Sequence, residues 1–217
     1  MYRLFLAIIL FADDICLLAP TRSALEKVIS MCGDYCSKLG LVFNPKKSKV
    51  SVFSKSRVDL STIKPISLAG SPIEYATSVR YLGVTIVSNR GFSVSAKDDI
   101  STFYRASNSI LNVLRKPDED VLMHLLITNC LPILSYACSV KSYSASDMRD
   151  CNVALNNAIR KVFTFNRWES IRSLREGFGL KSIYEIFAIS RRYFLENLVN
   201  HHNCILRVIA CNHLSVD

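Results

Sequence analysis

Two adjacent carboxylates, Asp13 and Asp14, are the side chains best suited to chemistry in this 217-residue sequence. They lie between two short apolar runs, 4–12 and 15–19. Proteins hold a hard cation such as Mg²⁺ through one or two carboxylates together with substrate phosphates. Two such ions can stabilise both the attacking and the leaving oxygen of a phosphoryl transfer. The pair therefore predicts a metal site on an exposed turn. Because Asp is also a common turn residue, a solvated turn is the alternative.

The segments around the pair must position it. The two apolar runs predict short strands within 4–19, joined by a polar turn at the carboxylates. A helix is expected next, opened by a capping box of Ser23 and Glu26. Gly40 suits the positive φ that often ends a helix. The apolar face of this helix would have a period of 3.6 residues and consist of Leu25, Val28, Ile29, Cys32, Cys36 and Leu39.

Further strands are expected up to residue 90, and helices after it. The first part would contain a strand at 41–43, a turn at 44–47, a returning strand at 50–53, and a hairpin-like unit from 66–68, 70–72 and 79–87. The second part would contain helices at 97–115, 119–140, 146–165 and 182–211, the third beginning at Ser146 or Asp147. Pro132 should kink or end the second helix. We place the boundary near Arg90.

Composition narrows the class of protein. Half of the residues are hydrophobic and 21% are charged, which excludes disorder as the dominant state. The net charge is +9, and residues 41–80 hold much of it, with two acids against seven bases: Lys46, Lys47, Lys49, Lys55, Arg57, Lys64 and Arg80. Such a segment favours a nucleic acid, an acidic partner or an anionic surface.

Two apolar segments imitate membrane anchors. The run at 4–19 is interrupted by the two carboxylates, and a signal peptide or span would not carry them at its centre. The segment 121–140 has the length of a span but contains His124, Asn129 and Pro132, which fits a buried helix better. Eight cysteines, several inside apolar runs, are expected to be reduced and buried.

Three ordered motifs resemble the reverse transcriptases of non-LTR (LINE-like) retrotransposons. Phe11-Ala12-Asp13-Asp14 is similar to the aromatic-x-Asp-Asp hairpin of that family. Gly40-Leu41 through Asn44, Lys47 and Ser48 resembles its next motif, and Tyr81-Leu82-Gly83 resembles the hairpin that grips the primer end. The resemblance extends from Ala7 to about Leu195, where the later segments look like the thumb and the region after it.

The resemblance implies roles for these residues. Asp13 would ligate the metals, with Asp14 as a supporting carboxylate, and Phe11 would pack beneath the tip. Lys47 would lie near the incoming triphosphate, although a solvated turn lysine is its alternative. The Tyr81-Leu82-Gly83 triplet would position the primer, or would simply pack in a core around a glycine bulge. Lys46, Lys47 and Lys49 would contact nucleic-acid phosphates.

The sequence also departs from the family pattern. A further catalytic Asp, the fingers and the nucleotide pocket of the family lie well upstream of the hairpin, and here ten residues precede Phe11. Because phosphoryl transfer depends on positioning and charge stabilisation together, we expect no polymerase activity from this chain alone.

Other groupings carry weaker signals. His201, Cys204, Cys211 and His213 could ligate zinc, but their spacing matches no compact finger. Trp168, beside Arg167 and near Phe163 and Phe165, could stack on bases, although a packing cluster at a helix end is the favoured interpretation. Arg191 and Arg192 are interpreted as a solvated face that could touch phosphate.

Together these features predict an α+β fold. Residues 1–90 would form the C-terminal half of a polymerase palm, with β-hairpins and a helix, and residues 91–217 an all-helical thumb and post-thumb region. The implied function is RNA-directed DNA synthesis, with Mg²⁺ or alternatively Mn²⁺ in a two-metal site that only a complete palm provides. The partners would be an RNA template, a DNA primer and deoxynucleotide triphosphates, with no membrane and an open oligomeric state. The family implies an intracellular, reducing location, nuclear or cytoplasmic. A non-catalytic nucleic-acid-binding or decayed transposon-derived protein is the alternative, and a small membrane protein is a third.

Overall fold

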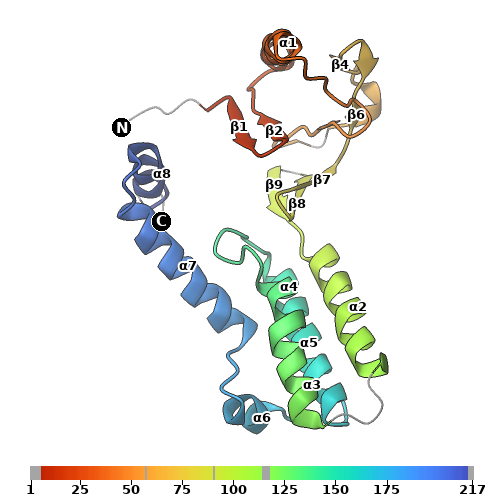
Figure 1. The fold of residues 1–217 in the computed structure, drawn as a ribbon, viewed down its shortest axis with the longest axis vertical. Helices are drawn as coiled ribbons and strands as arrows, with labels where there is room; N and C mark the ends of the chain where they lie inside the picture. The colour runs from red at the N-terminus through yellow and green to blue at the C-terminus, as the bar shows by residue number, and fades with distance from the viewer. Residues whose placement is uncertain (1–5, 57, 90, 114–117, 215–217) are drawn as a thin grey trace. The chain divides into compact units, whose positions relative to one another are not determined.

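The computed structural model describes residues 6–56, 58–89, 91–113 and 118–214 and divides the chain into two compact units (Figure 1). The N-terminal unit comprises Met1–Val79 and Ser88–Phe92, and the helical unit comprises Arg80–Val87 and Ser93–Asp217. Arg90, where the sequence predicts the boundary, is outside the described residues. Strands and helices are both present, so the mixed α+β class is confirmed.

The expected hairpin is present at the start of the N-terminal unit. Strands β1 (Ile8–Phe11) and β2 (Asp14–Leu17) pair antiparallel, with Phe11 opposite Asp14. Only Ala12 and Asp13 form the connection, and Ala12 has a φ of +52°. Few non-glycine residues adopt this left-handed conformation, and they occur mainly in tight turns. Asp13 therefore lies in the turn itself, whereas Asp14 begins the second strand.

Helix α1 (Arg22–Lys38) begins earlier than its predicted capping box. Its N-cap is Thr21, whose side chain accepts a hydrogen bond from the Ala24 backbone N–H at 3.2 Å. The expected cap at Ser23 is therefore wrong, because Ser23 already lies in the first turn. Arg22 donates to the Lys64 and Pro65 carbonyls, which ties this end of α1 to a distant loop. Gly40 has a φ of +69°, as predicted for the residue after a helix.

The core of the N-terminal unit is small. Leu25, Ile29, Phe43 and Tyr75 pack against it. It consists of four buried residues: Val50, Ile66, Leu68 and Ile73. Helix α1 itself has no buried residue, and Leu39, expected on its inner face, is 58% exposed. The apolar face of α1 is thus only half-covered.

Two of the strands expected next are absent or shortened. Residues 41–43 form no strand, because Val42 is 87% exposed and only Phe43 reaches the core. The strand expected at 50–53 is reduced to β3 (Lys49–Val50), which pairs in parallel with β6 (Glu74–Tyr75). A short 3₁₀ turn, η1 (Leu60–Thr62), lies between them.

The segments 66–68, 70–72 and 79–87, predicted as one hairpin-like unit with a turn at 70–72, belong to two separate sheets, and Ser71–Pro72 is a strand, not a turn. Strands β4 (Ser67–Leu68) and β5 (Ser71–Pro72) pair around Ala69 and Gly70, both with positive φ. A three-stranded sheet then follows in the order β7 (Ser78–Tyr81), β8 (Val84–Asn89) and β9 (Gly91–Val94). The β7–β8 connection is again two residues with positive φ, Leu82 and Gly83, the pattern that suits the twist of a hairpin.

The helical unit has the larger core. Helices α2 (Lys97–Val113), α3 (Glu119–Leu125), α4 (Leu131–Ser135) and α5 (Ala145–Val162) pack together (Figure 1). Helix α5 begins at an N-cap of Ser144, not at the predicted Ser146 or Asp147. Its inner face repeats every three or four residues and is buried throughout: Cys151, Ala154, Leu155, Ala158, Ile159 and Val162.

Pro132 interrupts the second predicted helix, as expected. The π-helical segment η2 (Leu126–Cys130) separates α3 from α4, and Pro132 is in the first turn of α4. Proline lacks the backbone N–H and clashes with the carbonyl of the residue four positions earlier, which prevents a regular α-helix across this point.

The last predicted helix is divided. Helix α7 (Ile183–Val199) ends at Asn200, and α8 (Cys204–Leu214) begins after a short break. A further helix, α6 (Arg172–Gly177), was not predicted. Within the described residues, no helix is both long and apolar enough to cross a membrane. Three of the eight cysteines, Cys130, Cys138 and Cys151, are buried as expected, whereas Cys204 and Cys211 are exposed.

Candidate functional site

The two carboxylates occupy the tip of the β1–β2 hairpin. Asp13 and Asp14 are both exposed, and within the described part of the chain neither side chain forms an ion pair or a hydrogen bond. No group of three or more His, Cys, Asp or Glu that could hold a metal occurs among the described residues. The tip therefore offers two uncommitted carboxylates, a donor set that fits Mg²⁺ when substrate phosphates supply further oxygens.

Apolar side chains around the tip are left uncovered. Leu10 is 66% and Phe11 61% exposed, so the expectation that Phe11 packs beneath the tip is wrong. The register places Leu10 with Ile15 on one face of the hairpin and Phe11 with Asp14 on the other. Both faces of this two-stranded ribbon are thus open over at least part of their area.

The lysines of the second motif lie on one turn and the strand that follows it. Asn44 organises this turn: its side chain accepts from the Lys46 backbone N–H at 3.1 Å, and its carbonyl accepts from those of Lys47 and Ser48. Lys46, Lys47 and Lys49 are all exposed. Lys49 approaches Glu74 at 3.9 Å, whereas Lys47 forms no ion pair with any described residue. Arg57, from the same basic segment, is outside the described residues.

The Tyr81-Leu82-Gly83 triplet forms the β7–β8 turn and belongs to the helical unit. Leu82 has a φ of +46° and Gly83 of +74°. All three side-chain positions are half-buried. The sequence prediction of a tight hairpin at this triplet is confirmed, while its contact with a primer stays a prediction.

Tyr136, which the sequence did not single out, holds this turn against the helical unit. Its hydroxyl donates to the Leu82 carbonyl at 3.2 Å. A Cβ atom added at Gly83 would lie 2.7 Å from Cε1 of the Tyr136 ring, a distance that real Cβ atoms do not adopt. The ring therefore occupies the space that a side chain at position 83 would need. No local pattern could reveal this contact, because 54 residues separate the two positions.

A buried charged pair supports the loop that carries Tyr136. The Lys141 side chain is fully buried, and its Nζ lies 2.6 Å from the carboxylate of Asp99 on α2. The Tyr143 hydroxyl donates to the same carboxylate at 2.5 Å, and burial followed by this hydrogen bond raises the pKa of Tyr143. Removing one partner of such a pair leaves an uncompensated charge in the core, which is strongly destabilising. Lys141 also lies 5.5 Å from the centre of the Tyr136 ring.

Among the described residues, the remaining candidates form no group that could hold a metal ion. Of the proposed zinc ligands, His201 accepts a hydrogen bond from the Asn203 backbone and its ring stacks on His202, while the side chain of His213 is outside the described residues. Trp168 is 83% exposed, so its interpretation as a packing residue is wrong.

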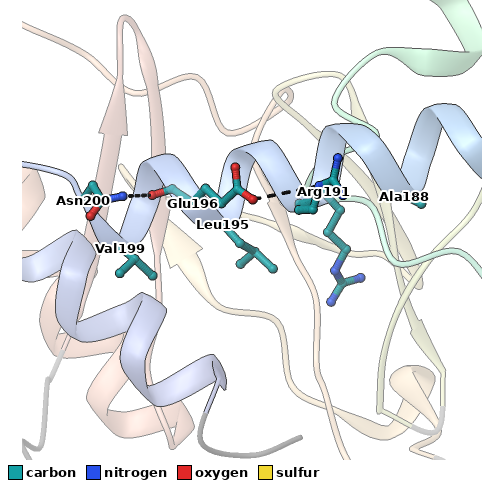
Figure 2. Close-up of a pocket in the computed structure, with 7 residues that line it drawn as sticks. Ala188, Arg191, Leu195, Glu196, Val199 and Asn200 are labelled. Atoms are coloured by element: carbon teal, nitrogen blue, oxygen red, sulfur yellow. Dashed lines mark hydrogen bonds and ion pairs between the residues drawn. The ribbon is translucent and has the colours of Figure 1, made fainter.

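A hollow of about 550 Å³ runs along α7, near Arg191 and Arg192 (Figure 2). Leu195 and Val199 project on the same side of the helix, and Arg192 approaches Glu196 at 3.9 Å. The residues that line the hollow are Ala188, Arg191, Arg192, Leu195, Glu196, Val199 and Asn200. None of the residues in the three motifs contributes to it, so we do not assign the hollow to the candidate site.

Comparison with known proteins relates the N-terminal part of the chain to a described family. Residues 2–86 match the family model described as reverse transcriptase (RNA-dependent DNA polymerase). No curated protein and no solved structure matches the chain. The matched segment includes all three motifs: the Asp13-Asp14 tip, the turn at 44–48 that carries Lys46 and Lys47 (the lysine turn), and the Tyr81-Leu82-Gly83 turn. The match supports a relation to reverse transcriptases, while the non-LTR type stays a prediction.

Proposed function

We propose that this chain is part of an RNA-directed DNA polymerase of the non-LTR retrotransposon type, and that it contacts a primer–template duplex. The observation that carries the proposal is the exposed pair Asp13 and Asp14 at the tip of a two-residue hairpin turn, inside the segment that matches the reverse transcriptase family. The N-terminal unit would contribute palm elements, and the helical unit would act as thumb and post-thumb region.

In this proposal, Asp13 and Asp14 would hold Mg²⁺, with Mn²⁺ as a substitute. A bound divalent ion supplies charge stabilisation for the attacking and leaving oxygens of nucleotidyl transfer. Asp13 would be the direct ligand because it lies in the turn, and Asp14 would add negative charge from the first position of β2. Lys47, exposed and without an ion pair among the described residues, would place a positive charge near the triphosphate of an incoming nucleotide.

The β7–β8 turn would position the primer strand. Its conformation is fixed by two consecutive positive φ values and by the Tyr136 contacts. A turn held in one conformation can place a backbone at a set distance from a ligand without losing much entropy on binding. The exposed Lys46, Lys47 and Lys49 would add non-specific contacts to duplex phosphates.

We also propose that the chain alone does not synthesise DNA. The tip carries two carboxylates, and within the described residues no group of three or more His, Cys, Asp or Glu could hold a metal. The uncovered Leu10 and Phe11 suggest that further protein packs on the hairpin in the active polymerase. Such protein would also be the source of an additional carboxylate.

A primer-extension assay tests this proposal. We expect no extension of a DNA primer on an RNA template by the purified chain with Mg²⁺ and deoxynucleotide triphosphates. Asp13→Asn provides the control for contaminating polymerases, since any background would be the same in both proteins. Synthesis that disappears in Asp13→Asn would show that the chain is catalytically complete and would overturn its proposed inactivity.

The second candidate function is nucleic-acid binding without catalysis, and the exposed lysine turn favours it. Filter binding measures this directly. Lys46→Ala combined with Lys47→Ala should weaken duplex binding and reduce the slope of log affinity against log salt by about 2. Asp13→Asn should leave the affinity unchanged. If the double substitution left the duplex affinity unchanged, Lys46 and Lys47 would not be part of the nucleic-acid interface.

A further inference from the structure

Trp168 is the only tryptophan of the chain and is 83% exposed. It lies between α5 and α6, next to a small aromatic cluster in which Phe163 contacts Phe165 and Phe178. The indole is not a member of that cluster. Because an indole presents a large apolar ring, proteins commonly use an exposed one as a contact residue. The exposed ring of Trp168 is therefore a candidate contact for a ligand.

The turn that presents Trp168 is held rigidly. Asn166 donates its backbone N–H and its side-chain amide to the Glu169 carboxylate, at 2.9 and 3.0 Å. The Glu169 backbone N–H in turn donates a hydrogen bond to the Asn166 carbonyl at 3.1 Å. Arg160 of α5 donates to the Glu169 carbonyl at 3.1 Å, which fixes the turn to the end of that helix. The backbone that carries the ring therefore has little conformational entropy to lose when a ligand binds.

The charge around this turn is positive. Residues 160–176 contain five basic and two acidic side chains, so their net charge is +3. Both acids are already engaged, Glu169 in the turn and Glu176 with Arg172 at 3.0 Å. Arg167, immediately before the indole, is exposed and forms no ion pair with a described residue. The residues directly before and after the ring, Arg167 and Glu169, are charged, which favours a ligand that itself carries charge over an apolar protein surface.

We propose that Trp168 is a stacking contact for an unpaired base of single-stranded nucleic acid, with Arg167 interacting with the adjacent phosphate. Every base has a flat apolar face, and aromatic side chains beside positive charge bind single strands through that face. This contact goes beyond the proposed duplex binding because it requires an unstacked base. It also uses residues of the helical unit, whereas the lysine turn belongs to the N-terminal unit.

Tryptophan fluorescence of the full chain tests the proposal, because the whole signal comes from this one residue. We expect a single strand of about 12 nucleotides to quench the emission saturably, and the same sequence as a duplex to quench it much less. Trp168→Ala should weaken single-strand binding about tenfold, measured by anisotropy of a labelled strand, and Trp168→Phe should retain most of the affinity. Quenching by either RNA or DNA supports the proposal, and the ratio of their affinities identifies the ligand.

Tyr35→Ala is the matched control. Tyr35 is 66% exposed but follows Asp34 and has no adjacent base, so its removal should not change the affinity. Single-strand binding that leaves the wild-type emission unchanged would overturn the proposal, and so would a single-strand affinity that Trp168→Ala does not lower. So would equal quenching by the duplex, or an emission change that follows protein concentration alone and so indicates self-association. Asp13→Asn should not affect the quenching, so this test and the primer-extension assay can fail independently.

Discussion

Gly83 combines two separate constraints at one position. Its φ of +74° is a conformation that alanine adopts only with strain, and the Tyr136 ring fills the space where a Cβ would lie. Gly70 has a similar φ of +78° but nothing within 4 Å of the Cβ position, and Gly177 has neither constraint. The three glycines therefore form a graded series within one chain.

We predict that Gly83→Ala lowers the free energy of unfolding by about 2 kcal/mol, because backbone strain and the clash with Tyr136 add together. Gly70→Ala should be less harmful, since only the strain applies. Gly177→Ala should be neutral or slightly stabilising. Urea unfolding followed by circular dichroism measures all three. Equal effects of Gly83→Ala and Gly70→Ala would show that Tyr136 does not constrain the turn.

Cys151 gives a pH-dependent prediction. Burial in the helical core, with smaller contributions from Asp147 and Asp99, raises the pKa of its thiol from 9.0 to about 12. Because the thiol binds its proton more tightly in the folded state, it stabilises that state fully at a pH below the unfolded pKa of 9.0. This stabilisation is lost as the pH rises from about 9 through 12. Cys151→Ala should therefore reduce the loss of stability over this range, as measured by urea unfolding at each pH. If the free energy of unfolding of Cys151→Ala fell with pH as steeply as that of the wild type, the raised pKa of Cys151 would be contradicted.

Helix α1 allows its start to be tested by two neighbouring hydroxyls. Thr21 accepts the capping hydrogen bond from the Ala24 backbone, whereas Ser23 lies within the helix. Thr21→Ala should cost about 1 kcal/mol of unfolding free energy, the usual value for a lost N-cap. Ser23→Ala is the matched control and should change stability by less than about 0.5 kcal/mol. A larger loss of stability in Ser23→Ala than in Thr21→Ala would contradict the cap at Thr21 and support the predicted capping box of Ser23 and Glu26.

Local patterns predicted the elements whose determinants are adjacent in sequence. The β1–β2 hairpin follows from an Asp pair between apolar runs, whereas the turn at Leu82-Gly83 was expected from the resemblance of Tyr81-Leu82-Gly83 to the family hairpin. The interruption at Pro132 follows from proline chemistry alone. In the β1–β2 hairpin and at Pro132 the residues that fix the structure lie within a few positions of one another, whereas the β7–β8 turn is also held by Tyr136, 54 residues from Leu82.

The errors arose where tertiary contacts decide the structure. Leu41-Val42-Phe43 has strand-forming side chains, but no neighbouring strand pairs with it and Val42 remains in solvent. The helix predicted over 182–211 is broken after Asn200, although the apolar pattern continues. At the candidate site, the carboxylates and lysines could be named from the sequence. Tyr136, Lys141 and Asp99 could not, because their roles come from contacts across more than forty residues.

The two units differ in how their apolar residues are buried. Helix α5 buries six residues in the core of the helical unit, whereas α1, of almost equal length, buries none. The core of the N-terminal unit has four buried side chains. The N-terminal unit thus leaves more of its apolar surface in solvent than the helical unit does. This agrees with the proposal that further protein packs on its hairpin.

We predict that backbone amides in the centre of α5 exchange with solvent deuterium much more slowly than those in the centre of α1. Exchange protection follows the free energy of local opening, which rises with the apolar surface buried around an element. Hydrogen-exchange mass spectrometry of the free chain measures both helices in one experiment. Similar protection in α1 and α5 would contradict the view that the N-terminal unit is incompletely covered.

Metal binding at the Asp13-Asp14 tip is the property that separates a polymerase-derived site from a simple nucleic-acid-binding surface. The most direct measurement is Mn²⁺ binding by electron paramagnetic resonance, in the presence of an RNA–DNA primer–template and a deoxynucleotide triphosphate. We predict that the wild-type chain binds Mn²⁺ beyond the amount bound by the nucleic acid and nucleotide alone. Asp13→Asn should lose this excess while retaining its duplex affinity. Equal Mn²⁺ binding by the two proteins would contradict the assignment of Asp13 as a metal ligand.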